Sequence, residues 1–175
     1  DSNDVLDRYY QCAKKFSLST IVRITSDCPL VDPNIIDDSI KFFKNNSFDY
    51  VSNVHPQTFP IGIAVEVFSF ESLQKAWKNA KLPSEREHVT QYIRNHSELF
   101  TLADFQYIPD ISMHRWTVDE PADFELVTKI YQALYPKNSN FKLAEIISLI
   151  QQQPELAKIN QNIERNEGMK KSELA

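Results

Sequence analysis

Glycine is scarce in this sequence. Its 175 residues include two, Gly62 and Gly168, whereas an average chain of this length carries about 12. Glycine lets a backbone approach a phosphate closely or turn at positive φ, so two widely separated glycines exclude a Walker loop and a dinucleotide-binding fingerprint. A nucleotide would have to be held without a glycine-rich cradle, or by residues outside this sequence.

Further absences exclude other classes of protein. There are 19 basic residues against 24 acidic ones, and the net charge of -5 argues against nucleic acid as the main partner. No apolar run approaches the roughly 18 residues of a membrane span, and no basic-then-apolar start indicates a secretory signal. Cys12 and Cys28 form neither a zinc-binding pattern nor a C-x-x-C motif. We therefore expect a cytoplasmic protein that binds neither nucleic acid nor membranes.

The apolar periodicity predicts alternating helices and strands. Helices are expected over residues 4–16, 71–81, 85–96 and 141–151, and after Pro33 and Pro121. Strands are expected over 20–24, 48–53, 63–70, 99–107 and 113–118. This alternation is typical of an α/β fold with a largely parallel sheet flanked by helices. We expect residues 1–153 to form one domain and residues 154–175 to form a tail with at most a short helix.

Two of the predicted strands end in the same local pattern. Asp27 follows the strand over 20–24 and precedes Pro29 by two residues, and Asp119 stands in the same relation to Pro121. Ligands of open α/β sheets bind at the carboxyl ends of strands, and Mg²⁺ prefers one or two carboxylates completed by phosphates and water. The pattern predicts a shared divalent-cation site. The alternative, that each aspartate is a helix cap or turn residue, stays open.

Charged residues close to these strand ends are candidate ligand contacts. Glu66 interrupts an apolar strand, so it faces a polar cleft or an arginine, unless the strand lies at a sheet edge with Glu66 in water. Arg23 and Arg115 could each pair with an aspartate or contact a phosphate. The run 84–90, which includes Glu85, Arg86 and His88, is either a solvated helix start or a polar wall that grips an anionic or hydroxylated ligand.

Six stretches of the sequence together resemble one protein family. They are DVLDRYYQCAKK (4–15), IVRITSDCPLVDP (21–33), DYVSNV (49–54), VEVFSFESLQKAW (65–77), SEREHVTQYIRNH (84–96) and RWTVDEPADFELV (115–127). Their order and spacing are similar to those of the spore-coat-polysaccharide (SpsF-like) cytidylyltransferases, which belong with the acylneuraminate and ketodeoxyoctulosonate cytidylyltransferases. The resemblance covers nearly the whole chain.

This resemblance implies a Rossmann-like nucleotidyltransferase sheet and a reaction. The anomeric hydroxyl of a sugar acid attacks the α-phosphorus of CTP, pyrophosphate leaves, and the activated sugar serves polysaccharide biosynthesis. Asp27 and Asp119 match the family's Mg²⁺-holding aspartates, which makes them the expected catalytic and metal-binding residues. The residues expected to bind substrate are Arg8, Arg23, Asn53, Glu66, Glu85, Arg86, His88 and Arg115.

The sequence also departs from the family pattern. Ser26 stands where the family usually has glycine, and Ile61 and Ala64 replace two aspartates. The family's opening segment, which resembles A-R-x-x-S-x-R-x-P-x-K and grips CTP, has no counterpart here. We therefore expect a sheet that is incomplete at its N-terminal side, with exposed strand edges, and little or no activity of the chain alone. A non-catalytic sugar-binding remnant, or a subunit that complements a separate N-terminal half, is the alternative; a homodimer is left open.

Overall fold

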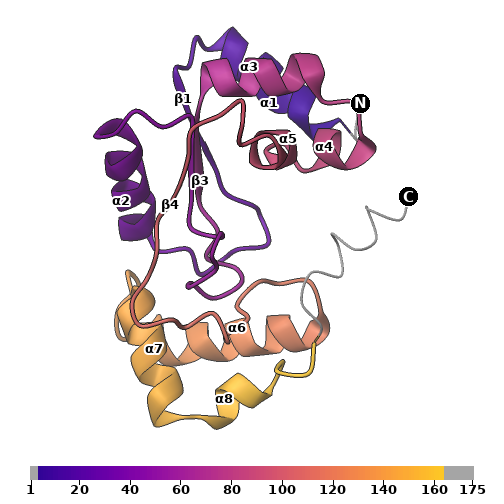
Figure 1. Ribbon diagram of the computed structural model, residues 1–175. Helices are drawn as coiled ribbons and strands as arrows, with labels where there is room; N and C mark the ends of the chain where they lie inside the picture. Colours follow the sequence, from indigo (N-terminus) through magenta and orange to yellow (C-terminus); the bar gives the residue numbers. More distant parts are fainter. Residues whose placement is uncertain (1–3, 164–175) are drawn as a thin grey trace.

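The computed structural model describes residues 4–163 (Figure 1). Gly168 and the rest of the expected tail after residue 163 lie outside the described residues. The elements follow in the order α1 (Val5–Lys15), β1 (Thr20–Arg23), α2 (Pro33–Lys44), β2 (Tyr50–Ser52), β3 (Glu66–Ser69), α3 (Phe70–Asn79), α4 (Pro83–Glu87), α5 (Gln91–Asn95), β4 (Leu102–Asp104), α6 (Pro121–Leu134), α7 (Leu143–Gln152) and α8 (Glu155–Lys158). None of the helices within residues 4–163 has the length and apolar character needed to cross a membrane.

The four strands form one sheet in the order β1-β3-β2-β4. The expected α/β fold with flanking helices is confirmed. The expectation of a largely parallel sheet is wrong, because β3 runs antiparallel to both β1 and β2, and only the β2–β4 pair is parallel. Parallel neighbours need a long crossover connection, usually a helix. The segment between β2 and β3 contains no helix, so the chain returns directly beside β2 in the opposite direction.

Local sequence explains where several helices begin. Asp4 caps α1 by accepting a hydrogen bond from the Asp7 N–H, and Asp32 caps α2 in the same way through Asn34. Pro33 occupies the first turn of α2, where its missing N–H leaves no bond unmade. Ser69 caps α3, and this ends the strand predicted over 63–70 at residue 69.

Two expected elements differ from the structure. The helix expected over 85–96 is split into α4 and α5, because Val89 has a φ of +57° that no α-helix accommodates. The strand expected over 113–118 is not formed. That segment makes a single parallel bridge, between Arg115 and Ile61, because the chain beside it turns away at Gly62.

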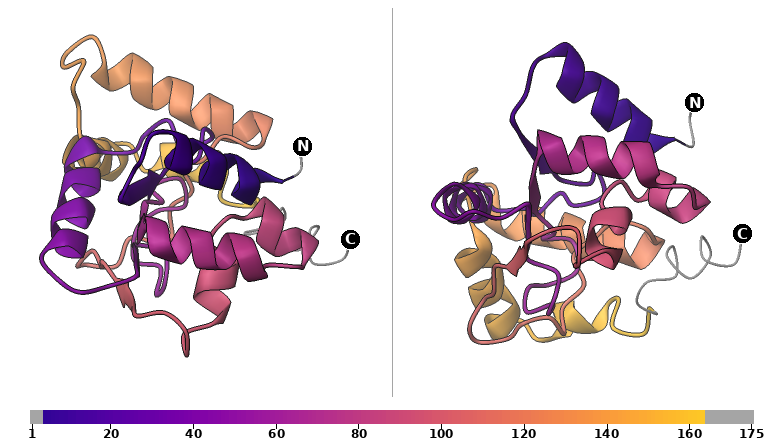
Figure 2. Two further views of the ribbon diagram at one scale, coloured as in Figure 1. Left: turned by 90° about the horizontal axis from the view of Figure 1, so that it is seen from above. Right: turned by 45° about the horizontal axis from the view of Figure 1, so that its top comes forward.

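The sheet separates two apolar cores. Alternate residues of a strand point to opposite faces, so Val51 and Val67 face one core while Tyr50 and Phe68 face the other. The first core is covered by α2, α6, α7 and α8, and the second by α1, α3 and α5 (Figure 1). Helices α1 and α3 pack side by side over this second core (Figure 2). The sheet therefore carries helices on both faces and leaves its strand ends for the site.

Candidate active site

The two aspartates predicted from the strand ends lie on adjoining segments. The Val118 N–H donates to the Asp27 carbonyl oxygen at 2.9 Å. The Thr117 hydroxyl lies 3.2 Å from the same carbonyl oxygen and 3.3 Å from Oδ2 of the Asp27 carboxylate. Asp119 directly follows Val118, and its side chain is 50% exposed. The fold thus brings together the two positions that the repeated pattern predicts.

A buried ionic cluster supports Asp119. Arg115 donates from Nη2 to Asp119 at 2.8 Å, and from Nε and Nη2 to the carboxylate of Asp123. Asp123 is fully buried and also accepts hydrogen bonds from the Asp119 and Glu120 N–H groups and from Asn160. Burial acts to raise the pKa of Asp123, but these partners outweigh it and lower the pKa. Arg115 therefore bridges an exposed carboxylate and a buried one.

Sequence reasoning missed two members of this cluster. Asp123 occupies the first turn of α6, where an acidic side chain reaches back to the free N–H groups of the helix start, and that position was a usable signal. Asn160 lies 37 residues further on and gives no local signal. It donates to Asp123 at 2.7 Å and to the Arg115 carbonyl oxygen at 2.8 Å.

Gly62 lets the loop before β3 pack closely against the segment that carries Asp119. Its φ is +98°, and a Cβ at this position would run into the backbone of Trp116 and Thr117. On the same stretch, Ile61 donates to the His114 carbonyl oxygen at 3.0 Å and accepts from the Trp116 N–H at 2.6 Å. The scarcity of glycine makes this position more informative, because Gly62 is required here for both conformation and space.

Glu66 is buried in the middle of the sheet. Its strand lies between β1 and β2, so the alternative of an edge strand facing water is wrong and the expected arginine partner is confirmed. Arg23 pairs with Oε2, while the hydroxyls of Tyr50 and Thr90 donate to Oε1 at 2.7 and 2.5 Å. Burial acts to raise the pKa of Glu66, but Arg23 and the two hydroxyls outweigh it, so the pKa is lowered. The carboxylate is held ionised.

A cleft of about 290 Å³ opens beside Glu66. Four of the residues predicted to bind substrate line it: Arg23, Asn53, Glu66 and His88. Asn53 is fully buried and binds the loop before β3, donating to the Ile63 carbonyl oxygen at 2.6 Å and accepting from the Val65 N–H at 2.8 Å. Asn53 therefore shapes the wall of the cleft.

The loop before β3 also lines this cleft. Ile61, Gly62, Ile63 and Ala64 line the cleft. Because Ile61 and Gly62 also contact the 114–117 segment, the cleft and the aspartate pair share this loop as a common wall. Ile61 and Ala64 make part of that wall apolar.

Three further residues predicted to bind substrate lie away from this cleft. Glu85 is buried and accepts from the Lys81 and Leu82 N–H groups, which fixes the start of α4. Arg86 donates to Asp4 at 2.5 Å, and from Nη1 to a carbonyl oxygen of α3 at 2.9 Å. Arg8 is exposed and lines a different, mostly apolar groove of about 470 Å³ between α1 and β1. The contacts of Glu85 and Arg86 hold α4 in place.

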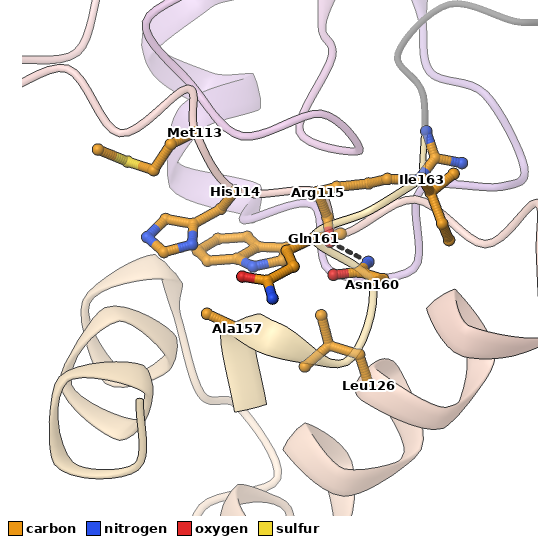
Figure 3. A pocket seen from close by; sticks show the side chains of 9 residues that line it. Met113, His114, Arg115, Leu126, Ala157, Asn160, Gln161 and Ile163 are labelled. Carbon is orange, nitrogen blue, oxygen red and sulfur yellow. Dashed lines mark hydrogen bonds between the residues drawn. The ribbon is translucent and has the colours of Figure 1, made fainter. Parts of the chain in front are cut away.

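A small cavity lies beside the ionic cluster and is lined by two of its members, Arg115 and Asn160. Figure 3 shows Met113, His114 and Arg115 above it, with Leu126 of α6 and Ala157 of α8 below. The His114 ring stacks on Trp116 at a centroid distance of 5.6 Å. The cavity volume is about 50 Å³, enough for water but not for a nucleotide or a sugar.

The arrangement defines an α/β domain with an acidic strand-end site beside a polar cleft. Residues 1–163 match the family model described as Cytidylyltransferase, and the chain belongs to that family. It is 37% identical over 163 residues to an uncharacterized protein of Methanocaldococcus jannaschii, an alignment that covers 91% of this chain and 65% of the relative. It is 31% identical over 159 residues to the spore coat polysaccharide biosynthesis protein SpsF of Bacillus subtilis, covering 87% of this chain and 63% of SpsF.

A solved structure is similar as well. A cytidylyltransferase from Leptospira borgpetersenii superposes with a TM-score of 0.85 at 30% sequence identity, covering 93% of this chain and 67% of that one. The chain spans 65% and 63% of the lengths of its two curated relatives. Family membership and the α/β fold are therefore established for the part of the protein described here.

Proposed function

We propose that this chain supplies the metal-binding and sugar-binding part of a CTP-dependent cytidylyltransferase. In the full-length protein, the anomeric hydroxyl of a sugar acid attacks the α-phosphorus of CTP and pyrophosphate leaves. The observation that carries the proposal is the placement of Asp27 and Asp119 on hydrogen-bonded segments that share the 61–64 wall with a polar cleft. The family match and the name of the Bacillus subtilis relative support a role in polysaccharide biosynthesis.

We infer that Asp27 and Asp119 hold a magnesium ion together with the phosphates of the nucleotide. No group of three or more potential metal-ligating side chains occurs within residues 4–163, but Mg²⁺ bound with a nucleotide needs one or two carboxylates and takes its remaining ligands from phosphates and water. Asp27 is half-buried and Asp119 is exposed, so both carboxylates have access to such a ligand set. The ion would neutralise phosphate charge and orient the displacement.

The surrounding residues prepare these carboxylates. The Thr117 hydroxyl orients Asp27 through Oδ2. Arg115 holds Asp119 by a single hydrogen bond while Asp123 fixes the guanidinium from its buried side. Asp119 can therefore give up its hydrogen bond from Arg115 and coordinate a metal ion, while Asp123 keeps Arg115 in place. A carboxylate preset in this way loses little conformational freedom when it binds.

A non-catalytic sugar-binding subunit is the second candidate function. It is favoured by Ile61 and Ala64, which put apolar side chains into the cleft where the resemblance implies aspartates. Such a subunit would bind a sugar acid without releasing pyrophosphate. For both candidates we propose a cytoplasmic location, which suits the free thiols of Cys12 and Cys28.

Pyrophosphate release distinguishes the two candidates. We expect the full-length protein to release pyrophosphate from CTP in the presence of a sugar acid and Mg²⁺, and to stop when the metal is chelated. Asp27→Asn and Asp119→Asn should each abolish release and weaken Mn²⁺ binding measured by electron paramagnetic resonance. Asp37→Asn, at an exposed position of α2, is the matched control. Unchanged turnover in both site variants contradicts the metal assignment.

A further inference from the structure

Asn160 joins the chain that follows α8 to the ionic cluster around Asp119. It lies just beyond the end of α8 and is buried, with 4% of its surface exposed. Its Nδ2 donates to Oδ1 of Asp123 at 2.7 Å and to the Arg115 carbonyl oxygen at 2.8 Å. Figure 3 shows the bond to Arg115 beside the small cavity. Both partners are acceptors only, so the amide nitrogen must face them and both of its hydrogens are used.

Asp123 passes this constraint on to Asp119 in two ways. Its Oδ2 accepts from the Asp119 N–H at 3.2 Å, which fixes the main chain at that position. The same oxygen accepts from Nη2 of Arg115 at 2.8 Å, and this nitrogen also donates to Oδ2 of Asp119 at 2.8 Å. Asp119 is therefore held at its main chain directly and at its carboxylate through Arg115.

Arg115 is fixed at both its main chain and its side chain. Its main chain lies between the bridge to Ile61 and the hydrogen bond from Asn160. Its Nε donates to the two oxygens of Asp123 at 3.0 and 3.2 Å, and its side chain is 11% exposed. Asn160 thus binds the main chain of Arg115 and also the carboxylate that holds its guanidinium.

We propose that Asn160 is a positioning residue that presets Asp119 for a divalent cation. Without its amide, the buried carboxylate of Asp123 loses a hydrogen bond and Arg115 loses a main-chain anchor, so neither directs Asp119 as firmly. A carboxylate that is free to move must give up that freedom when it binds, and this lowers its affinity for the cation. The positioning role rests on the proposed function, because it takes Asp119 as a metal ligand.

Two substitutions separate the hydrogen bonds of Asn160 from the space that it fills. Asn160→Leu keeps a side chain of similar size and no charge, removes both donors and excludes water from the carboxylate. Asn160→Ala also removes the donors, but it opens space next to a cavity of about 50 Å³, from which a water molecule can donate to Asp123. A hydrogen-bonding role makes Asn160→Leu the more damaging change, whereas a packing role makes Asn160→Ala the more damaging one.

The affinity of the full-length protein for Mn²⁺, measured by electron paramagnetic resonance, is the main readout. We expect Asn160→Leu to raise the dissociation constant about three- to tenfold and Asn160→Ala to raise it less, because water restores part of the lost bonding. Two controls should leave it unchanged. Asn79→Leu removes an exposed amide that donates to the Lys75 carbonyl oxygen on α3, and Ile146→Val removes a methylene from the first core.

NMR reports on Arg115 itself in the absence of metal. Its Nε–H resonance is identified by its absence in Arg115→Lys. We expect this proton to exchange with water faster in Asn160→Leu than in wild type or in Ile146→Val at the same pH, because the carboxylate that shields it is held less firmly. Circular dichroism confirms that each variant is folded. If Asn160→Leu does not fold, Asn160→Ala is compared with Ile146→Val in both assays.

Asp119→Asn in the same Mn²⁺ assay separates this inference from the proposed function. The positioning role is wrong, and the metal assignment stands, if Asp119→Asn weakens binding while Asn160→Leu does not. It is equally wrong if Asn160→Ala binds more weakly than Asn160→Leu, or if Ile146→Val weakens binding as much. An affinity that Asp119→Asn leaves unchanged overturns the metal assignment and the positioning role together.

Discussion

Replacing Glu66 by Gln tests how much the buried charge pair contributes to stability. Gln keeps the size of the side chain, and the hydroxyls of Tyr50 and Thr90 can rotate to suit the amide. What is lost is the negative charge opposite Arg23, whose side chain is 19% exposed against 6% for Glu66. Removing one partner of a fully buried pair costs 3–5 kcal/mol; since Arg23 retains some water, we expect about 2–3 kcal/mol.

The loss should depend on pH in a defined direction. The pKa of Glu66 is lowered from its ordinary value of 4.5 in the folded protein, so the folded state binds this proton less readily than the unfolded state. The stabilisation is therefore complete above the ordinary pKa and disappears as the pH falls through the lowered one. The difference between wild type and Glu66→Gln should be constant from neutral pH to about 5.5 and shrink below that.

Urea unfolding of the 175-residue chain measures the free-energy loss and its pH dependence. In thermal unfolding we expect the melting temperature of Glu66→Gln to fall by about 5–10 °C, whereas Glu71→Gln, on the exposed start of α3, should change it little. A cycle with Arg23→Met should give a coupling energy of about 2 kcal/mol. A loss below about 0.5 kcal/mol, zero coupling, or a difference that grows as the pH falls refutes the reasoning.

Three further changes probe other parts of the site. Gly62→Ala should destabilise the chain by about 3 kcal/mol in urea unfolding, because of its positive φ and the clash of Cβ with backbone. Asp123→Ala should lower the free energy of unfolding by about 3–5 kcal/mol, because it leaves the buried partners of this carboxylate unpaired. Asp119→Ala should lower it by under about 1 kcal/mol, because Asp119 is half exposed. Equal losses contradict the interpretation that Asp123 supports the site while Asp119 is available for a metal ion. Burial and the charge of Arg94 lower the pKa of His55 from 6.5. The folded state therefore binds this proton less readily than the unfolded state, and the contribution of His55 to stability is lost as the pH falls below 6.5. Arg94→Gln should raise the pKa of His55 in an NMR titration.

Periodicity predicts the elements of this fold better than their directions. The amphipathic helices appear close to their expected ranges, since each buries one apolar stripe against the sheet. Strand direction depends on how the chain reconnects, and the helix-free return from β2 to β3 made two pairings antiparallel. The break at Val89 was also hidden, because a β-branched residue gives no warning of a positive φ.

The residues of the candidate site also differ in how far the sequence predicts them. Asp27 and Asp119 could be paired from the sequence, because each stands two residues before a proline at the end of an expected strand. Their role in metal binding stays a prediction. Partners that meet only in the folded chain, such as Asn160 with Asp123 or His55 with Arg94, could not be found, since the contact spans 37 and 39 residues.

The loop before β3 links the two halves of the site mechanically. Gly62 has its backbone against Trp116 and Thr117, and Thr117 holds Asp27. The same loop is fixed from the cleft side by Asn53, which binds the residues on either side of Ala64. A movement of this loop therefore cannot alter the cleft without altering the surroundings of the aspartates. In a chain with so few glycines, Gly62 is the residue that lets one backbone segment both line the cleft and pack against the 116–117 backbone beside Asp119.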